Sequence, residues 1–199
     1  MITKGERTRR RVLERCAPVF NTKGYSGASM SDLVQASGLE KGGIYNHFVS
    51  KEQLALESFD YAAGIMRGRF DAALAEKDGA LERLFAVVDV LGALVEDPPV
   101  AGGCPVLNTA VESDDAHPAL KERAREAMSG WLRLIGRLVK DGKESGELSP
   151  DADPRSTSSV VVATLEGALM LSRLHDDPAH MYRAVEHLKR YLESLEEGE

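Results

Sequence analysis

The chain has 199 residues, which is long enough for one or two domains with a buried hydrophobic core. Apolar residues make up 43% of the sequence and charged residues 29%, which excludes a disordered or fibrous chain. Residues 1–55 contain nine Lys or Arg against five Asp or Glu, whereas residues 56–199 are acidic and bring the whole chain to −7. A basic N-terminal part on an acidic remainder predicts that the N-terminal part binds a polyanion.

The sequence contains no recognisable signal for secretion or membrane insertion. Its N-terminus has no apolar stretch with a small-residue cleavage site, and the apolar stretches 84–95 and 159–171 are interrupted by Asp89 and Glu166. The two cysteines lie too far apart in the sequence to form a disulfide framework. We therefore expect a cytoplasmic protein without membrane contact, and no motif calls for a cofactor.

Apolar residues recur at helical spacing along almost the whole chain, which predicts an all-α fold of about nine helices. Glycines, prolines and serine–acid pairs mark the expected helix ends. The expected helices span residues 3–23, 29–37, 41–48, 50–77, 79–96, 105–113, 118–141, 154–174 and 178–196. The seventh helix is expected to fray into the polar segment 142–149.

Two of these helices are short and flank Gly38. Ser29 and the acidic residue three positions later form a capping box that opens the first of them, whose Leu33 is expected to face inward. Ile44 and Phe48 give the second helix its inner face. Glycine permits the tight left-handed turn between them. Two short helices that cross at such a turn form a helix-turn-helix, whose second helix can lie in the DNA major groove.

The segments that carry the motif are Gly24-Tyr25, Ser29-Met30-Ser31-Asp32-Leu33-Val34, Gly38-Leu39-Glu40-Lys41-Gly42-Gly43-Ile44-Tyr45-Asn46-His47-Phe48 and Ser50-Lys51-Glu52-Gln53-Leu54. Together they resemble the DNA-binding domain of the tetracycline-repressor (TetR) family over roughly residues 5–60. The resemblance implies an all-α homodimer, with a helix-turn-helix domain over residues 1–50 and a ligand-binding and dimerisation domain over residues 51–199. It also implies transcriptional repression that a small-molecule effector relieves.

The residue types in the motif suit contacts with double-stranded DNA. Phosphates bind cations and amide donors, whereas base edges are read by side chains in the groove. We expect Lys41 to bind guanine and Asn46 to bind adenine, and the resemblance implies that Tyr45 and His47 contact phosphates. The predicted DNA-binding residues are Arg9, Arg10, Ser29, Lys41, Gly42, Gly43, Tyr45, Asn46, His47 and Lys51, with Arg11 near the flanking backbone.

Two positions depart from the family pattern. Many members carry a hydroxyl residue where Glu40 stands and Thr, Ser or Ala where Gly43 stands. We expect the Glu40 carboxylate to cap the start of the second short helix, and the glycines to let that helix approach the groove closely. These departures affect which operator sequence is read. The alternative is a helix-turn-helix that persists only as an inert scaffold.

The last two expected helices carry more apolar surface than one packing face requires. Apolar residues spread around most of the circumference of 160–174, which predicts burial on more than one side. In the final helix they follow the 4-3-4-3 spacing of helix packing. The residues with this spacing are Met181, Val185, Leu188, Leu192 and Leu195. We expect a homodimer through helices 154–174 and 178–196; alternatively, they only close the core of one chain.

A ligand pocket is typically an apolar cavity with a few polar groups, and the acidic part of the chain offers such residues. The predicted ligand-binding residues are Tyr61, Phe85, Cys104, Asn108, Met128, Trp131, Glu166 and Met170. Glu166 is the strongest candidate because an acid on an apolar helix needs a partner. For each residue taken alone, ordinary packing is the alternative.

Cys104 follows two glycines at a predicted helix start, in a segment that resembles one found in some members of the family. A few of these members sense oxidants or electrophiles through such a cysteine, and a helix N-terminus favours the thiolate. The alternative is a small buried residue at Cys104. Cys16 lies on the apolar stripe of the first helix, with Leu13, Ala17 and Phe20, so we expect it in the core. Because His175, His180 and His187 lack further metal ligands, we expect no metal site.

Three classes of function remain for comparison. The main hypothesis is a dimeric repressor that leaves a palindromic operator when it binds a small-molecule effector, with redox or electrophile sensing through Cys104 as its variant. An enzyme would need titratable groups that converge in the acidic part, and the sequence offers only isolated candidates. A scaffold that binds another protein would need neither a stable homodimer nor a pocket. We therefore predict a regulator and not an enzyme.

Overall fold

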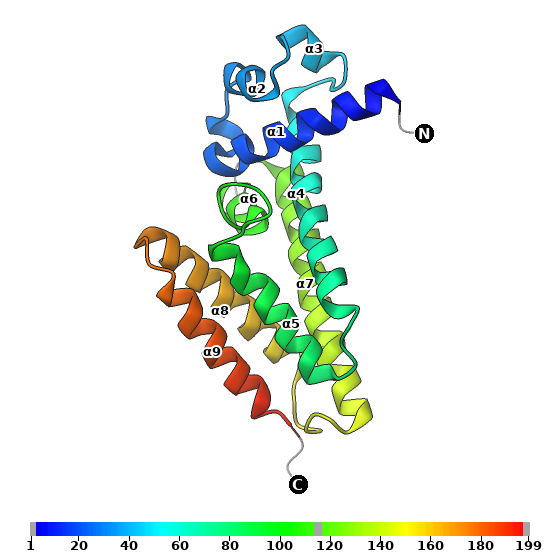
Figure 1. Cartoon of the computed structure of the whole chain (residues 1–199), viewed down its shortest axis with the longest axis vertical. Coiled ribbons are helices and arrows are strands. Elements are labelled where there is room, and N and C mark those ends of the chain that lie inside the picture. The colour runs from blue at the N-terminus through cyan, green and yellow to red at the C-terminus, as the bar shows by residue number, and fades with distance from the viewer. Residues whose placement is uncertain (1–2, 114–116, 197–199) are drawn as a thin grey trace. The chain divides into compact units, whose positions relative to one another are not determined.

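The computed structural model describes residues 3–113 and 117–196, and the chain is helical throughout that part, with no β-strand (Figure 1). The α-helices are α1 (Lys4–Gly27), α2 (Met30–Ser37), α3 (Lys41–Tyr45), α4 (Lys51–Leu74), α5 (Ala80–Gly92), α6 (Pro105–Ser113), α7 (Pro118–Ser145), α8 (Pro154–Leu174) and α9 (Ala179–Glu193). A 3-10 turn, Ala93–Val95, follows α5. The expected all-α fold and its number of helices are confirmed.

The chain divides into two compact units, each formed from two segments. The first unit comprises Met1–Ile65 and Pro99–Glu126, and the second comprises Met66–Pro98 and Ala127–Glu199. The first unit is therefore larger than the helix-turn-helix domain expected over residues 1–50, because it includes α6 and the first parts of α4 and α7. None of the described helices combines the length and apolarity that a bilayer span requires.

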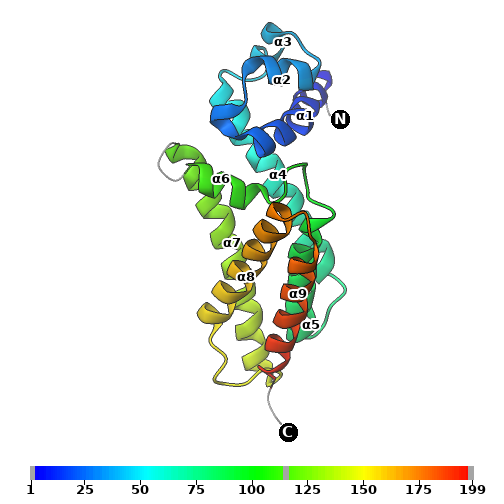
Figure 2. The same cartoon turned by 90° about the vertical axis from the view of Figure 1, so that its left-hand side faces the viewer.

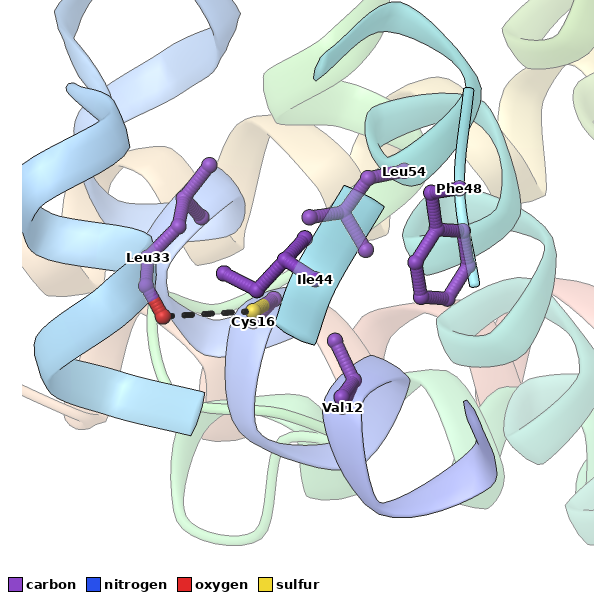
Figure 3. Close-up of a cluster of buried hydrophobic side chains, with 6 residues drawn as sticks. All are labelled: Val12, Cys16, Leu33, Ile44, Phe48 and Leu54. Atoms are coloured by element: carbon purple, nitrogen blue, oxygen red, sulfur yellow. Dashed lines mark hydrogen bonds between the residues drawn. The ribbon is translucent and has the colours of Figure 1, made fainter. Parts of the chain in front are cut away.

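The core of the helix-turn-helix joins side chains from four helices and the segment between α3 and α4 (Figure 3). The buried side chains are Val12, Cys16, Leu33, Ile44, Phe48 and Leu54. Cys16 Sγ donates a long hydrogen bond of 3.9 Å to the carbonyl oxygen of Leu33, and burial raises the pKa of the Cys16 thiol to about 11. The expected core position of Cys16 is therefore confirmed.

Local sequence signals set the helix ends in this unit. Ser29 Oγ accepts from the backbone N–H of Asp32 at 3.1 Å, and the Asp32 carboxylate accepts from the N–H of Ser29 at 2.8 Å, which completes the expected capping box. Gly38 ends α2 with φ 69°, in the left-handed region. Glu40 makes no side-chain hydrogen bond at the start of α3, so the expected cap by its carboxylate is not formed.

In the second unit, α8 packs against α9, and both contact α5 (Figure 2). Leu165 and Leu169 of α8 and Leu188 of α9 are buried in this packing. The expected fraying over residues 142–149 is wrong, because α7 continues to Ser145 and the segment that follows it is anchored. Its Glu147 carboxylate accepts from two backbone N–H groups at the start of α5, a position where a negative charge is favoured.

Candidate DNA-binding surface

The side chains of α3 divide between the core and the surface. Ile44 is 1% exposed and anchors the helix, whereas Lys41, Tyr45 and Asn46 are exposed. His47, just after the helix, is half-buried. Because Gly38 turns the chain and Ile44 fixes the rotation of α3, the residues expected to read bases lie on the outer face of the helix.

A second exposed group lies at the start of α2. The hydroxyl of Ser29 donates to Asp32 Oδ2 at 2.7 Å, and Lys23 Nζ lies 2.6 Å from Asp32 Oδ1. The hydrogen bond from Lys23, together with those from Ser29, lowers the pKa of the Asp32 carboxyl well below its ordinary value. Ser29 is exposed, but its hydroxyl is engaged by Asp32. A phosphate contact here would use the backbone N–H groups at the start of α2, and the expected role of Ser29 stays a prediction.

Lys51, at the start of α4, is held by contacts within the unit. Its Nζ donates to the carbonyl oxygen of Tyr25 and lies 4.4 Å from the centroid of the Tyr25 ring. No local pattern marks this partner, because the two residues are 26 positions apart in the chain. The ammonium group is therefore positioned by α1, and its expected phosphate contact stays a prediction.

The arginines of α1 occupy different environments. Arg9 forms an ion pair with Glu57, and its guanidinium lies 4.6 Å from the centroid of the Phe48 ring. Arg10 pairs with Glu14 one helical turn away and remains on the surface. Since Arg9 braces α1 against the α3–α4 region, its first role is to hold the helix-turn-helix together, and Arg10 is the better placed of the two for a phosphate.

Comparison with known proteins agrees with this geometry. The sequence profile described as "Bacterial regulatory proteins, tetR family" matches residues 13–57. The profile described as "Tetracyclin repressor-like, C-terminal domain" matches residues 80–188. The chain belongs to the TetR family.

Two solved TetR-family structures share the fold over nearly their full lengths. A TetR transcriptional regulator from Chloroflexus aurantiacus is 46% identical, with a TM-score of 0.92, over 95% of this chain and 96% of that one. A regulator from Cytophaga hutchinsonii is 33% identical, with a TM-score of 0.91, over 100% of both chains. The transcriptional repressor DhaR from Mycobacterium sp. is 24% identical over 83% of this chain and 82% of its own. This TetR-family protein is thus a DNA-binding transcriptional regulator and not an enzyme.

The residues expected to bind a ligand fall into both units. Tyr61, Cys104 and Asn108 belong to the first unit, whereas Phe85, Met128, Trp131, Glu166 and Met170 belong to the second. Trp131 packs edge-to-face on Phe70 with the ring centroids 5.8 Å apart, and Glu166 is only 6% exposed. Met170 is 53% exposed, so it lies on the surface of α8 instead of lining an interior pocket.

Two of these residues lie at α6: Cys104 precedes its first residue, and Asn108 attaches the helix to α1. The side-chain amide of Asn108 donates to the backbone oxygen of Asn21 at 3.1 Å, to its Oδ1 at 3.0 Å and to the oxygen of Gly102 at 2.8 Å. Cys104 is 1% exposed at the start of α6, and its Sγ accepts from the N–H of Leu107 at 3.4 Å. The geometry explains Asn108 as a structural residue.

Sequence reasoning missed Glu112 of α6. Its carboxylate accepts from the backbone N–H groups of Tyr25 and Ser26 at 2.9 and 3.0 Å. These amides follow Gly24, whose φ of 73° and ψ of 171° kink α1. The partners are 87 and 86 residues apart, and no local pattern marks such a pairing.

The histidines form no metal site in the described part of the chain. The rings of His175 and His180 lie with their centroids 5.5 Å apart. Within residues 3–113 and 117–196, no group of three or more His, Cys, Asp or Glu residues is arranged to hold a metal ion.

Proposed function

We propose that the protein is a dimeric repressor that binds a palindromic operator and leaves it when a small-molecule effector binds. The observation that carries the proposal is the outward face of α3, where Lys41, Tyr45 and Asn46 are exposed while Ile44 is buried. Two such helices related by a two-fold axis fit two successive turns of the major groove, which gives the operator its palindromic symmetry.

Each residue of this surface has a defined role in the proposal. Lys41 binds guanine and Asn46 binds adenine, because their donors and acceptors match those base edges. Tyr45 and His47 bind phosphates beside the groove. Lys51 contributes its charge at the start of α4, where the carbonyl of Tyr25 holds it in position. Gly42 at the start of α3 leaves space for the DNA backbone, since no atom lies within 4 Å of a Cβ built on it, whereas a Cβ on Gly43 would contact Leu39 at 3.4 Å.

The dimer forms through α8 and α9 in this proposal. One side of α8 is buried within the second unit. The rest of the helix carries apolar side chains that are between 37% and 70% exposed, namely Val160, Met170, Leu171 and Leu174. Gly167 lies between these residues in the sequence, and a Cβ built on it meets no atom within 4 Å. An exposed apolar stripe with a small residue near its middle favours close packing against a second copy of the helix.

The effector is proposed to bind in the second unit, beside buried residues such as Trp131 and Glu166. A carboxylate among apolar side chains can give a ligand a polar contact that fixes its orientation. Binding would favour conformers in which the two α3 helices no longer match successive major grooves. The release is then a shift in population whose size depends on the difference in effector affinity between the two states.

A second candidate is release through oxidation or alkylation of Cys104. Its sulfur accepts an N–H at the start of α6, a position that stabilises a thiolate, and α6 is bonded to α1 through Asn108 and Glu112. Serine in place of Cys104 should abolish release from DNA by peroxide or N-ethylmaleimide. Undiminished release of the serine variant would eliminate this candidate.

The test of the main proposal is titration of the full-length chain on duplexes from the DNA upstream of its own gene. Fluorescence anisotropy at two salt concentrations should give specific binding that weakens steeply with salt, because phosphate contacts release counterions. Asn46→Ala should relax the preference at one base pair and leave binding to unrelated duplexes unchanged. A DNA affinity that does not change with salt concentration would contradict the proposal, as would an Asn46→Ala variant whose base-pair preference is unaltered.

A further inference from the structure

A small cavity lies within the first unit, among α1, α4, α6 and the start of α7. Its volume is about 30 Å³, enough for about two groups the size of a water molecule. The lining residues share small or apolar side chains with a few polar groups among them. They include Ala17, Phe20, Ala55, Ser58, Phe59 and Ala62. None of the residues expected to bind a ligand lines this cavity.

The wall contributed by α4 carries a hydroxyl group without a partner. The residues of α4 that line the cavity recur at spacings of three and four positions, so they lie on one face of the helix. They are Ala55, Ser58, Phe59 and Ala62. Ser58 is 1% exposed, and its Oγ has no hydrogen-bond partner among residues 3–113 and 117–196. Such a group is costly to bury, and native proteins rarely leave one unsatisfied.

Other polar side chains of the wall are already engaged within the unit. Asn21 donates to the carbonyl oxygens of Ala101 and Gly103 at 3.0 and 3.2 Å. The Glu112 carboxylate accepts the two N–H groups that follow Gly24. The hydroxyl of Ser58 therefore has hydrogen-bonding capacity to offer to a molecule in the cavity.

We propose that this cavity, widened by a small shift of α6 away from α1, is a binding site for a small neutral molecule with a short apolar part and one oxygen, of the class of short-chain alcohols, aldehydes and ketones. The apolar part contacts the alanine and phenylalanine walls, and the oxygen exchanges a hydrogen bond with Ser58 Oγ. An anion is excluded because no cationic side chain is among the lining residues. A cation is disfavoured because most of the wall is apolar and the Glu112 carboxylate already accepts two backbone N–H groups.

Occupancy of this site acts on the attachment of α6 to α1. Asn21 and Glu112 line the cavity and also carry hydrogen bonds that join the two helices. A molecule larger than the cavity must therefore separate α6 from α1, because packed walls do not stretch continuously. Cys16 of α1 lies in the core that supports α3. A shift of α1 therefore disturbs the support of α3, and occupancy of the cavity lowers DNA affinity. This consequence rests on the proposed function.

The direct test is methyl NMR of the full-length protein labelled in its alanine methyl groups. Three alanines, Ala17, Ala55 and Ala62, line the cavity, whereas Ala124 and Ala168 are buried elsewhere. Titration with 1-propanol should shift the three lining methyls along saturable curves and leave the two control methyls in place. Xenon, which has no hydrogen-bonding group, should shift the same three methyls. Shifts of equal size at all five alanines, or none at the lining three, would overturn the proposal.

Two variants separate the hydrogen bond from the space. Ser58→Ala should weaken 1-propanol binding roughly two- to tenfold, the effect of one hydrogen bond, while xenon binding persists. This variant should fold at least as well as the wild type, because it removes an unsatisfied buried hydroxyl. Ala55→Leu should abolish the binding of both probes by filling the cavity. Unchanged 1-propanol affinity in Ser58→Ala would overturn the proposed hydrogen bond.

A separate measurement tests the regulatory consequence. The protein bound to a fluorescent duplex from its own upstream DNA should dissociate as 1-propanol rises through the range that saturates the lining methyls, and Ser58→Ala should need a correspondingly higher concentration. Binding at the methyls without any change in DNA affinity would overturn the consequence for regulation and still support the site. Failure of DNA binding in the absence of 1-propanol would instead contradict the proposed function.

Discussion

The surfaces of α3 and α8 are both exposed but differ in chemistry. The outer face of α3 carries Lys41, Tyr45 and Asn46, whose donors and acceptors suit a hydrated polyanion. The exposed face of α8 includes Met170, 53% exposed, and Leu174, 70% exposed, and such a face loses contact with water when it packs against another apolar surface. The difference in chemistry supports the two partners that we propose, DNA for α3 and a second copy of the chain for α8.

The two surfaces also depend on different supports. The five residues of α3 are too few to form a stable helix alone, so its orientation depends on the buried Ile44 and Phe48. The 21 residues of α8 pack along α9 and α5 on their buried side. Damage to the core should therefore remove the α3 surface at once, whereas the α8 surface should tolerate changes to its exposed side chains without unfolding.

The largest effect is expected for Phe48→Ala, which removes a ring that is 1% exposed. It should lower the free energy of unfolding by about 3–5 kcal/mol through lost burial and the cavity left behind. Val49→Ala is the matched control, because the neighbouring Val49 is 86% exposed and should change stability by no more than about 0.5 kcal/mol. Urea unfolding measures both, and equal losses would contradict the core described beneath α3.

A substitution of Met170 and Leu174 by glutamate should dissociate the dimer while each chain stays folded. Burying unpaired carboxylates in an apolar interface is costly, so the dissociation constant should rise by roughly a hundredfold or more. Sedimentation velocity at micromolar concentration measures the change. Glutamates at the exposed Arg133 and Arg137 of α7 serve as the control. A double variant that remains dimeric would show that α8 is not the interface.

Lys41→Ala should weaken specific DNA binding by about 1–3 kcal/mol, the contribution of one base contact. Far-UV circular dichroism and thermal unfolding should be unchanged, because Lys41 is exposed and has no ion-pair partner within the described residues. Lys51→Ala should lower both DNA affinity and the melting temperature, since its ammonium group also bonds to Tyr25. A lowered melting temperature in Lys41→Ala, with an unchanged one in Lys51→Ala, would contradict the roles assigned to the two lysines.

Gly24→Ala should lower the free energy of unfolding by about 1–3 kcal/mol. Its φ of 73° and ψ of 171° are adopted almost only by glycine, and a Cβ there would lie 2.5 Å from the Glu112 carboxylate. Gly27 makes a matched control, since a Cβ at that position meets only Lys23 Cβ at 3.8 Å. Thermal and urea unfolding of the two variants should differ clearly, and an unaffected Gly24→Ala variant would contradict the Glu112 contact.

The smallest effect concerns pH. Hydrogen bonds from Lys23 and Ser29 lower the pKa of Asp32, so the carboxylate stabilises the folded state above its ordinary pKa and loses this effect as pH falls through the lowered folded value. Asp32→Asn should therefore melt below the wild type near neutral pH, and the gap should narrow in increasingly acidic buffers. If the difference in melting temperature widened as the pH fell, the Asp32 pKa would not be lowered in the folded state.

Local patterns in the sequence predicted much of the fold. The capping box at Ser29, the left-handed Gly38 and the stripe through Cys16 each act within a few residues, so the physics that sets them is visible in the sequence. Contacts between distant segments were not predictable. Glu112 and Lys51 each bond to the backbone near Tyr25 from far along the chain, and the partner of such a group depends on the tertiary arrangement.

The candidate site divides in the same way. Lys41 and Asn46 were predictable because residue type and position on a short helix determine their exposure. The cavity at Ser58 was not, because it exists only where small side chains on separate helices meet. Met170 illustrates the reverse error, since an apolar residue on a mostly buried helix was assigned to a pocket and lies on the surface.

Selection of binding sites from a pool of random duplexes, with the full-length protein as bait, tests the central claim most directly. The account predicts enrichment of a two-fold symmetric sequence whose half-sites lie about one helical turn, or a multiple of it, apart. The Asn46→Ala variant should retain the symmetry but lose the preference at one position in each half-site. Enrichment of asymmetric sequences, or of none, would contradict the account.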